Sequence, residues 1–399
     1  MNDNVLIFQE LPDSPLSLRI AVVTETYPPE VNGVAMTLAR IVDGLQRRNH
    51  RIQLIRPRQH AAETPACNVH LEEVLSRGVP IPRYQGLRIG LPAKRALFRL
   101  WSLKRPDVVH IATEGPLGWS ALAAAVKLRL PVSTGFHTNF HSYSQHYGVG
   151  FLKKPIAAYL RRFHNRAQAT LVPTEDLRRE LAILGFENLR VVSRGVDTML
   201  FSPARRSPRM RRNWGATGGE PVALYVGRIA PEKNLKLLVR AFFSMRTRVP
   251  QARLVMVGDG PERAALAARH PDIVFAGTRT GEDLAAHYAS ADIFLFPSLT
   301  ETFGNVTLEA MASGLAVVAY DYAAAQQYLT HEHSGLLAPF DDGEAFVRLA
   351  TALAADPVRA ALLRVQARAS AERIDWDNVF HDFEVVLRDV MQRQEASAV

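Results

Sequence analysis

The sequence contains a single cysteine, Cys67, among its 399 residues. One cysteine can form neither a disulfide within the chain nor a thiolate-rich metal site, and so low a content is typical of proteins from a reducing compartment. No apolar run approaches the roughly 18 uncharged residues that a membrane-spanning helix needs. The N-terminal segment lacks the basic region and the small-residue cleavage site of a signal peptide. These absences predict a cytoplasmic protein that does not span a membrane.

Acidic residues are scarce in the first half of the chain. The whole sequence carries 48 Lys and Arg against 39 Asp and Glu, a formal charge of +9, whereas residues 1–198 hold 26 basic and only 16 acidic side chains. Two stretches, 74–106 and 115–174, contain no acidic residue. Such a field attracts anionic partners, among them lipid headgroups and phosphorylated substrates. Because no nucleic-acid-binding module is recognisable, we expect no nucleic-acid partner.

Short apolar runs alternate with helical patterns along the chain, which predicts parallel, doubly wound α/β sheets. The strands expected in the first half are residues 18–23, 51–55, 107–111, 132–136, 169–172 and 189–192. Those expected in the second half are residues 222–227, 253–258, 273–276, 293–297 and 316–319. The polar stretch 202–221 separates the two series, and we interpret it as the domain boundary. Ligands are then expected in a cleft at the carboxyl ends of the strands.

Two cations follow the first predicted strand of the second half. Arg228 comes directly after the glycine that ends this strand, and Lys233 lies five residues later. Cations fixed at the carboxyl end of a strand suit a diphosphate, because Arg makes a forked contact and Lys supplies a point charge. The alternative is a pair of solvated surface cations after an ordinary turn.

A second motif spans residues 297–314, where a loop and a glycine follow an apolar strand and precede a helix that should begin near Asn305. The N–H groups of a first helical turn form an anion site, and Gly304 lets a phosphate approach closely. Glu301 precedes this helix and Glu309 lies within it. A glutamate pair alone is usually solvated, but together with the strand, the glycine and the helix start it favours a binding site.

The segment ETFGNVTLE, residues 301–309, resembles the E-x7-E motif of the retaining glycosyltransferases of family 4. Further motifs of that family follow in the same order over nearly the whole chain: YPPEVNGV (27–34), FHTN (136–139), SRGVD (193–197), VGR (226–228) and VGDGP (257–261). The resemblance implies the GT-B fold, which consists of two facing Rossmann-like domains with a cleft between them. It further implies an acceptor-binding domain at 1–198, a nucleotide-sugar-binding domain at 199–372, and a C-terminal helix at 373–399 that returns to the first domain.

The resemblance also implies roles for residues of the C-terminal half. Arg228 and Lys233 would hold the diphosphate of the donor, and Glu309 would bond the ribose hydroxyls. Glu301 would lie beside the transferred sugar. The backbone that caps the phosphates would be that of Phe303, Gly304, Asn305 and Val306.

Two residues of the first half complete the implied site. Gly33, in the loop after the first strand, would approach the donor phosphate from the opposite domain; taken alone it reads equally well as an ordinary turn glycine. His137 stands at the end of a predicted strand, where doubly wound sheets place functional groups, and the resemblance puts it near the hydroxyls of the donor sugar.

We expect no metal site and no cofactor, since the nucleotide sugar is a co-substrate. His141 and His146 follow His137, but this spacing without a nearby carboxylate is atypical of zinc sites. The sequence Asp-Trp-Asp at 375–377 matches the metal-binding motif of other glycosyltransferases. It precedes a helical pattern, so we interpret Asp377 as a helix cap and Trp376 as a packed anchor.

The basic half of the chain bears on the acceptor. Segments 94–104 and 151–166 both have apolar residues at helical spacing with Lys and Arg around them. Such helices can rest on an anionic membrane surface or simply pack their apolar stripe inward, and the two interpretations are compatible. The N-terminal motif resembles the branch of the family that contains glycolipid mannosyltransferases and sulfoquinovosyl-diacylglycerol synthases.

The expected function is therefore the retaining transfer of a hexosyl group to a membrane lipid on the inner face of the plasma membrane. GDP-mannose is the expected donor, and UDP-glucose is the alternative. A polysaccharide or oligosaccharide is the alternative acceptor. From another class of function, a nucleotide-sugar epimerase or a non-catalytic nucleotide-sugar-binding protein of the same fold remains a competing interpretation.

Overall fold

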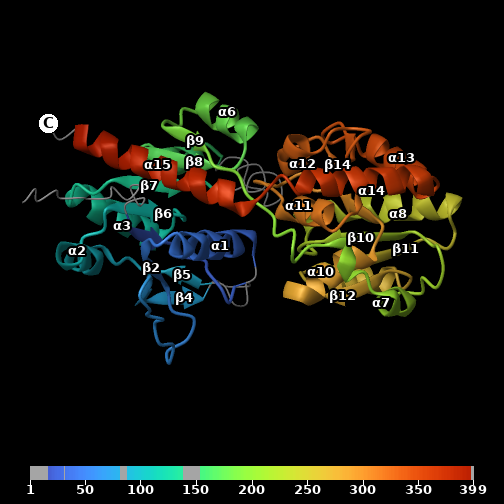
Figure 1. Cartoon of the computed structure of the whole chain (residues 1–399), viewed down its shortest axis with the longest axis horizontal. Coiled ribbons are helices and arrows are strands. Elements are labelled where there is room, and N and C mark those ends of the chain that lie inside the picture. The colour runs from blue at the N-terminus through green and yellow to red at the C-terminus, as the bar shows by residue number, and fades with distance from the viewer. Residues whose placement is uncertain (1–16, 31, 81–87, 138–152, 397–399) are drawn as a thin grey trace, which may run out of the picture.

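The computed structural model of the protein describes residues 17–30, 32–80, 88–137 and 153–396. Figure 1 shows two α/β domains side by side along the longest axis, with the C-terminal helix running across the first of them. Each domain contains a parallel sheet with helices packed on both faces. This confirms the predicted fold class of two facing, doubly wound domains.

The sheet of the N-terminal domain has seven parallel strands in the order β3-β2-β1-β6-β7-β8-β9. The strands are β1 (Arg19–Val23), β2 (Arg51–Pro57), β3 (Leu71–Ser76), β6 (Val108–Ile111), β7 (Val132–Gly135), β8 (Ala169–Val172) and β9 (Leu189–Val191). The helices are α1 (Gly33–Arg47), α2 (Lys94–Leu103), α3 (Pro116–Lys127), α5 (Lys153–His164) and α6 (Glu175–Ile183). A small antiparallel hairpin, β4 (Gly78–Pro80) and β5 (Arg88–Gly90), stands apart from the main sheet.

The sheet of the C-terminal domain has six parallel strands in the order β12-β11-β10-β13-β14-β15. They are β10 (Val222–Val226), β11 (Arg253–Val257), β12 (Val274–Gly277), β13 (Ile293–Phe296), β14 (Ala316–Tyr320) and β15 (Leu336–Ala338). The helices are α7 (Pro208–Asn213), α8 (Leu235–Arg248), α9 (Arg263–Arg269), α10 (Gly281–Ser290), α11 (Asn305–Ala312), α12 (Ala323–Tyr328), α13 (Gly343–Ala354) and α14 (Pro357–Ala371). Two short 3-10 helices, η2 (Pro203–Arg205) and η3 (Pro231–Lys233), lie in its loops.

The strand order of each sheet reverses once, and this reversal locates a ligand crevice. In the first sheet the reversal lies between β1 and β6, and in the second it lies between β10 and β13. At such a point the loops after the two adjacent strands diverge to opposite faces, which opens a crevice beyond the carboxyl ends. The loops after β1, β10 and β13 are those that carry the motifs described above.

The chain crosses between the domains twice, and the two crossings lie against each other. Val192 packs in the core of the first domain, whereas Val196 packs in the core of the second. The Val196 N–H donates a 3.1 Å hydrogen bond to the Ile374 carbonyl of the returning chain. A Cβ on Gly195 would lie 2.8 Å from the Trp376 nitrogen, so only glycine permits this close approach.

The polar stretch 202–221, which was predicted from the sequence as the domain boundary, is folded onto the C-terminal domain. It carries η2 and α7, which pack on the C-terminal domain through Asp292, at the start of β13. The Asp292 carboxylate lies 2.7 Å from Arg206, 2.8 Å from Arg211 and 3.3 Å from Arg364. Two arginines of this stretch, Arg206 and Arg211, are therefore paired with one largely buried carboxylate.

The C-terminal helix α15 (Trp376–Ala396) belongs to the packing of the N-terminal domain. Phe383 is 1% exposed and meets the His110 ring edge to face, with 4.9 Å between the ring centroids. Glu384 lies 2.7 Å from the buried His50 and 2.9 Å from Arg48. Asp375, and not Asp377, caps the helix, because the Asn378 N–H donates to the Asp375 carboxylate at 2.8 Å.

We expect Phe383→Ala to destabilise the N-terminal domain by about 3–5 kcal/mol, because it removes a fully buried ring and leaves a cavity. Val385→Ala on the same helix is the matched control, since Val385 is 43% exposed. Scanning calorimetry of both variants measures the difference. Equal, small shifts of the unfolding temperature would show that α15 does not stabilise the domain.

Candidate active site

The carboxyl edges of the two sheets face each other and are in contact. The hydroxyl of Thr302, after β13, donates to the carbonyl of His137, after β7, at 3.1 Å. The side-chain amide of Asn305, at the start of α11, donates to the Thr37 hydroxyl on α1 at 3.4 Å. Of the residues that the sequence assigns to a donor site, His137 and Asn305 therefore lie at the contact between the two domains.

In the C-terminal domain, the loops after the adjacent strands β10 and β13 bring a lysine and a glutamate together. Lys233 lies at the end of η3, and its ammonium group forms an ion pair with Glu301. The Ser298 hydroxyl donates to the same carboxylate oxygen at 2.7 Å. Both charged side chains are largely buried, with 16% and 15% of their surfaces exposed. The sequence prediction that these two loops share one site is consistent with this contact.

Arg228 lies on the same loop as Lys233 but is more exposed. It forms an ion pair with Glu232, four residues later, while 45% of its side chain remains accessible. The Tyr225 hydroxyl donates to the Arg228 carbonyl at 2.9 Å and so holds the backbone of the loop. Arg228 is thus anchored at its backbone and still accessible at its guanidinium.

The α11 helix begins at Asn305, as predicted, and Gly304 precedes it. Gly304 has φ +92, in the left-handed region that non-glycine residues rarely adopt. The buried Phe303 fixes the turn from inside, and its carbonyl accepts a hydrogen bond from the Ala324 N–H at 2.9 Å. The first-turn N–H groups of this helix, including those of Asn305 and Val306, lie at the interdomain gap, where an anion is favoured.

Glu309 lies one turn into α11 and has a neutral partner. The Tyr288 hydroxyl on α10 donates to its carboxylate at 2.8 Å. Burial raises the pKa of Glu309 to about 7, although the hydrogen bond from Tyr288 acts in the opposite direction. Glu301 and Glu309 therefore differ in environment: the first is paired with a cation, and the second is desolvated without one.

In the N-terminal domain, Gly33 is the first residue of α1. The side chain of Asn32 caps this helix by accepting hydrogen bonds from the N–H groups of Val34 and Ala35 at 3.1 and 2.9 Å. Its amide in turn donates to the Thr26 hydroxyl at 2.7 Å. A Cβ on Gly33 would lie 3.8 Å from the Asn305 side chain. The starts of α1 and α11 therefore face each other across the gap.

His137 is held by Arg194, whose guanidinium donates to the His137 Nδ1 atom at 3.2 Å. Because a guanidinium can only donate, Nδ1 must be the acceptor, and the proton of the neutral ring lies on Nε2. Burial, followed by the charge of Arg194, holds the pKa of His137 well below its ordinary value. Within the described residues the Nε2 atom has no partner, and the ring lines a cavity of about 30 Å³.

Arg194 belongs to the SRGVD motif, but no role for it was predicted from the sequence. The residue follows β9, contacts both domains and is only 6% exposed. The signal that could have identified Arg194 is its position as a basic residue just beyond a strand of an open sheet. Arg228 was predicted as a site residue from the same kind of position.

Two further histidines were considered as metal ligands in the sequence. His141 and His146 lie outside the described residues. Among residues 17–30, 32–80, 88–137 and 153–396, no three His, Cys, Asp or Glu side chains gather closely enough to hold a metal ion.

We expect Glu309→Gln to gain stability relative to the parent protein as the pH rises. A carboxyl whose folded pKa is about 7 binds its proton more tightly in the folded than in the unfolded chain, so its ionisation costs stability between about pH 4.5 and 7. Denaturant unfolding at pH 5 and pH 8 measures the difference between the two proteins. Glu282→Gln, at an 80% exposed side chain, is the control. A difference that does not change with pH would contradict a desolvated Glu309.

Comparisons with known proteins identify the family of the chain. Residues 31–200 match the model of the family "Glycosyltransferase Family 4", and residues 220–356 match that of "Glycosyl transferases group 1". The chain is 35% identical over 330 residues to the GDP-mannose-dependent alpha-mannosyltransferase of Mycobacterium tuberculosis, a match that covers 82% of this chain and 85% of that protein.

Two further similarities extend the comparison. The chain is 33% identical over 311 residues to the sulfoquinovosyl transferase SQD2 of Arabidopsis thaliana, covering 75% of this chain and 60% of that protein. The structure of sucrose-phosphate synthase from Thermosynechococcus elongatus superposes with a TM-score of 0.76 at 19% identity, covering 94% of this chain and all of that one. The family models, the relatives and the shared fold agree, and the chain belongs to glycosyltransferase family 4.

Proposed function

We propose that this protein is a retaining, metal-independent glycosyltransferase that moves a mannosyl group from GDP-mannose to a membrane lipid. The observation that carries the proposal is the contact between Lys233 and Glu301 beside the start of α11. This arrangement places a cation, a carboxylate and a helix N-terminus at the point where the strand order reverses. A diphosphate and the sugar attached to it fit such a combination of charges.

The chemical demand of the reaction lies in the leaving group. Cleavage of the anomeric C–O bond leaves an oxocarbenium-like sugar and a nucleoside diphosphate, and the protein lowers the barrier by stabilising the charge that develops on the diphosphate. Arg228, Lys233 and the first-turn N–H groups of α11 perform this function together. Because these groups neutralise the departing diphosphate directly, the mechanism requires no divalent cation.

Glu301 and His137 act on the sugar side of the bond. Lys233 holds the Glu301 carboxylate in place through their ion pair, and a negative charge beside the anomeric carbon stabilises the positive charge of the transition state. His137, neutral with its proton on Nε2, donates a hydrogen bond to a sugar hydroxyl. Gly33 leaves room for the phosphate on the side of the N-terminal domain, and Glu309 accepts hydrogen bonds from the ribose.

The choice of donor and acceptor rests on the relatives. The M. tuberculosis protein is named for GDP-mannose, and the A. thaliana protein for the transfer of sulfoquinovose. Relatives named as alpha-monoglucosyldiacylglycerol synthases, among them that of Acholeplasma laidlawii at 27% identity, favour a diacylglycerol-type acceptor. UDP-glucose is the alternative donor.

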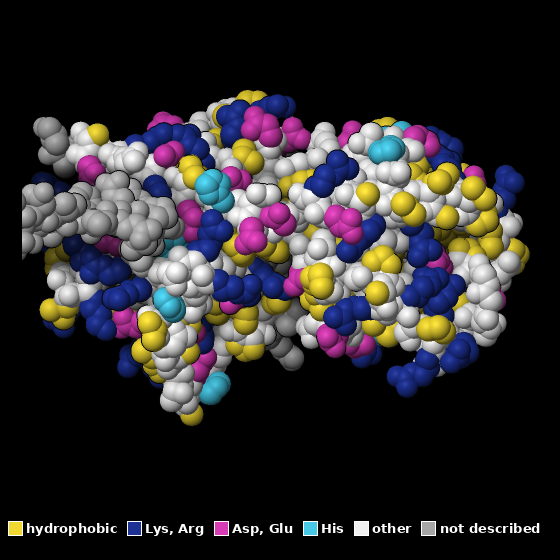
Figure 2. Space-filling model, viewed as in Figure 1, with side chains coloured by type: hydrophobic (Ala, Val, Ile, Leu, Met, Phe, Trp, Pro, Cys, Tyr) yellow, Lys and Arg dark blue, Asp and Glu magenta, His cyan; other side chains and the backbone are white. Residues whose placement is uncertain are grey.

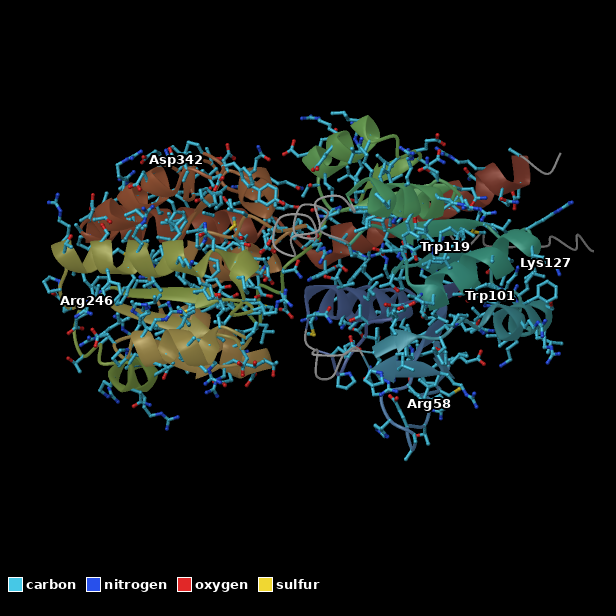
Figure 3. The ribbon with its side chains drawn as sticks, turned by 180° about the vertical axis from the view of Figure 1, so that it is seen from behind. Arg58, Trp101, Trp119, Lys127, Arg246 and Asp342 are labelled. Carbon is cyan, nitrogen blue, oxygen red and sulfur yellow. The ribbon has the colours of Figure 1, made fainter. Side chains whose placement is uncertain are left out.

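A cationic surface of the N-terminal domain supports a lipid acceptor. The apolar stripe of α2 packs inward through Leu97 and Trp101, and the indole N–H of Trp101 donates to Gln53 on β2 at 2.9 Å. Arg95 and Arg99 are exposed, and Leu103 is 87% exposed. Figure 2 shows dark blue Lys and Arg side chains at the end of the N-terminal domain where α2 lies. Figure 3 shows Trp101 and Lys127 at this same end of the domain.

This surface is suited to the headgroup region of an anionic membrane, because exposed cations attract the lipid charge and an exposed leucine adds apolar contact. No helix of the described residues is both long and apolar enough to cross a bilayer. We therefore infer peripheral association at the cytoplasmic face, with the acceptor reached from the membrane surface.

Transfer of labelled mannose from GDP-mannose to a membrane lipid extract tests the proposal. We expect Arg228→Met and Lys233→Met each to lower the rate by about 10²–10³, the loss typical of one preorganised contact to developing charge. The matched control is Lys236→Met, because Lys236 is exposed on the next turn of the chain. A labelled lipid whose anomeric configuration is inverted would contradict the retaining mechanism. Label that enters only water-soluble glycan would contradict the lipid acceptor.

We expect the protein to sediment with vesicles of anionic lipid and to be released by high salt, because screening weakens the attraction between exposed charges. Arg95→Ala/Arg99→Ala should reduce this binding several-fold, whereas Arg209→Ala/Arg212→Ala should not. Arg209 and Arg212 are exposed on α7 of the other domain, so this control variant removes the same net charge. Binding that is indifferent to salt, or equally reduced in both variants, would contradict the assignment of this surface.

A further inference from the structure

Arg194 is a buried cation that lacks a counter-ion in the described part of the chain. The residue is 6% exposed, and its pKa is lowered to about 10 by burial, with no carboxylate acting against that shift. The nearest acidic residue in the sequence, Asp197, is engaged elsewhere: it pairs with Arg40 at 2.6 Å and accepts hydrogen bonds from the Met199 and Leu200 N–H groups. Burying a charge without a counter-ion is costly, so this guanidinium requires an explanation.

The partners of Arg194 are neutral and come from both domains. Its guanidinium donates to the Thr37 hydroxyl at 2.7 Å and to the Gly33 carbonyl at 3.4 Å, both on α1. It also donates to the Asn305 side chain at 3.4 Å, and it lies 5.5 Å from the centre of the Phe303 ring. These contacts orient the guanidinium between the two domains but leave its charge uncompensated.

Arg194 and Lys233 both contact the short segment 301–305, which precedes and begins α11. Phe303 and Asn305 approach Arg194 from one side, while Glu301, in the same short segment, is paired with Lys233 on the other side. The segment 301–305 is therefore flanked by a lysine of the C-terminal domain and an arginine of the N-terminal domain. The starts of α1 and α11 add positive potential to the same place. An anionic ligand would balance the charge of Arg194, which has no counter-ion among the described residues.

We propose that Arg194 is a third cation for the diphosphate of the donor, supplied by the N-terminal domain; this inference rests on the proposed function. Arg228 and Lys233 then hold the diphosphate from the C-terminal domain, and Arg194 stabilises it from the opposite side. Because Arg194 contacts α1 and α11 at once, the bound diphosphate also favours the arrangement in which the two domains touch. Free nucleoside diphosphate and intact nucleotide sugar both carry the diphosphate that the Arg194 guanidinium would contact.

Calorimetric titration with GDP, GMP and guanosine tests the inference in the full-length protein. We expect Arg194→Met to weaken GDP binding by about 10- to 100-fold, the effect of losing one charge-assisted contact, and to leave guanosine binding unchanged. Arg194→Lys should retain part of the GDP affinity because it keeps the charge. Arg40→Met is the matched control, since Arg40 lies on α1 and its charge is already paired with Asp197.

A second measurement separates binding from folding. Without ligand, Arg194→Met should unfold at a temperature no lower than that of Arg40→Met, because it removes an unpaired buried charge. With GDP, its unfolding temperature should rise less than that of the control.

Three results would overturn the inference: equal losses of GDP affinity in Arg194→Met and Arg40→Met, an equal loss for guanosine, or Arg194→Lys as weak as Arg194→Met. The last two would indicate a purely steric role. Failure of the proposed function is distinguishable, because in that case Arg228→Met/Lys233→Met would itself bind GDP normally.

Discussion

The contact between the carboxyl edges of the two parallel sheets is the constraint on which the site depends. Parallel strands direct all their following loops to one edge, and here the edges of both domains meet through Thr302 with His137 and through Asn305 with Thr37. Both helix starts at this gap, and the three basic side chains around it, contribute positive potential. The fold thereby brings together three cations, two of them paired with Glu232 and Glu301, and two helix starts, and a diphosphate is the ligand that we propose for them.

The two glutamates of the motif illustrate how position within one short segment sets their chemistry. Glu301 lies in the loop before α11, where the ammonium group of Lys233 reaches it, so it offers a fixed negative charge. Glu309 lies within α11 against Tyr288, where desolvation raises its pKa to about 7. One carboxylate is therefore suited to oppose positive charge on a sugar, and the other to accept hydrogen bonds from neutral hydroxyls.

The sequence allowed the fold class and most strands to be predicted, because strands buried on both faces appear as continuous apolar runs, as in β10 and β14. The edge strand β3, with sequence LEEVLS, was not predicted, since all its side chains are only half-buried and two are acidic. The packing of 202–221 on the C-terminal domain was not predicted, because composition does not reveal that Arg206 and Arg211 share Asp292. Arg194 was missed for a similar reason: its isolation from carboxylates is a property of three-dimensional packing. Which aspartate caps α15 also depends on backbone geometry that a local pattern leaves open.

The most direct test of this account is a crystal structure of the protein with GDP bound. The account predicts the diphosphate at the start of α11, with its oxygens within hydrogen-bond distance of Lys233 and Arg228 and facing Gly33 across the gap. A diphosphate bound elsewhere, or one whose only protein contacts are water-mediated and exposed, would contradict the central claim that this gap is built around a pyrophosphate.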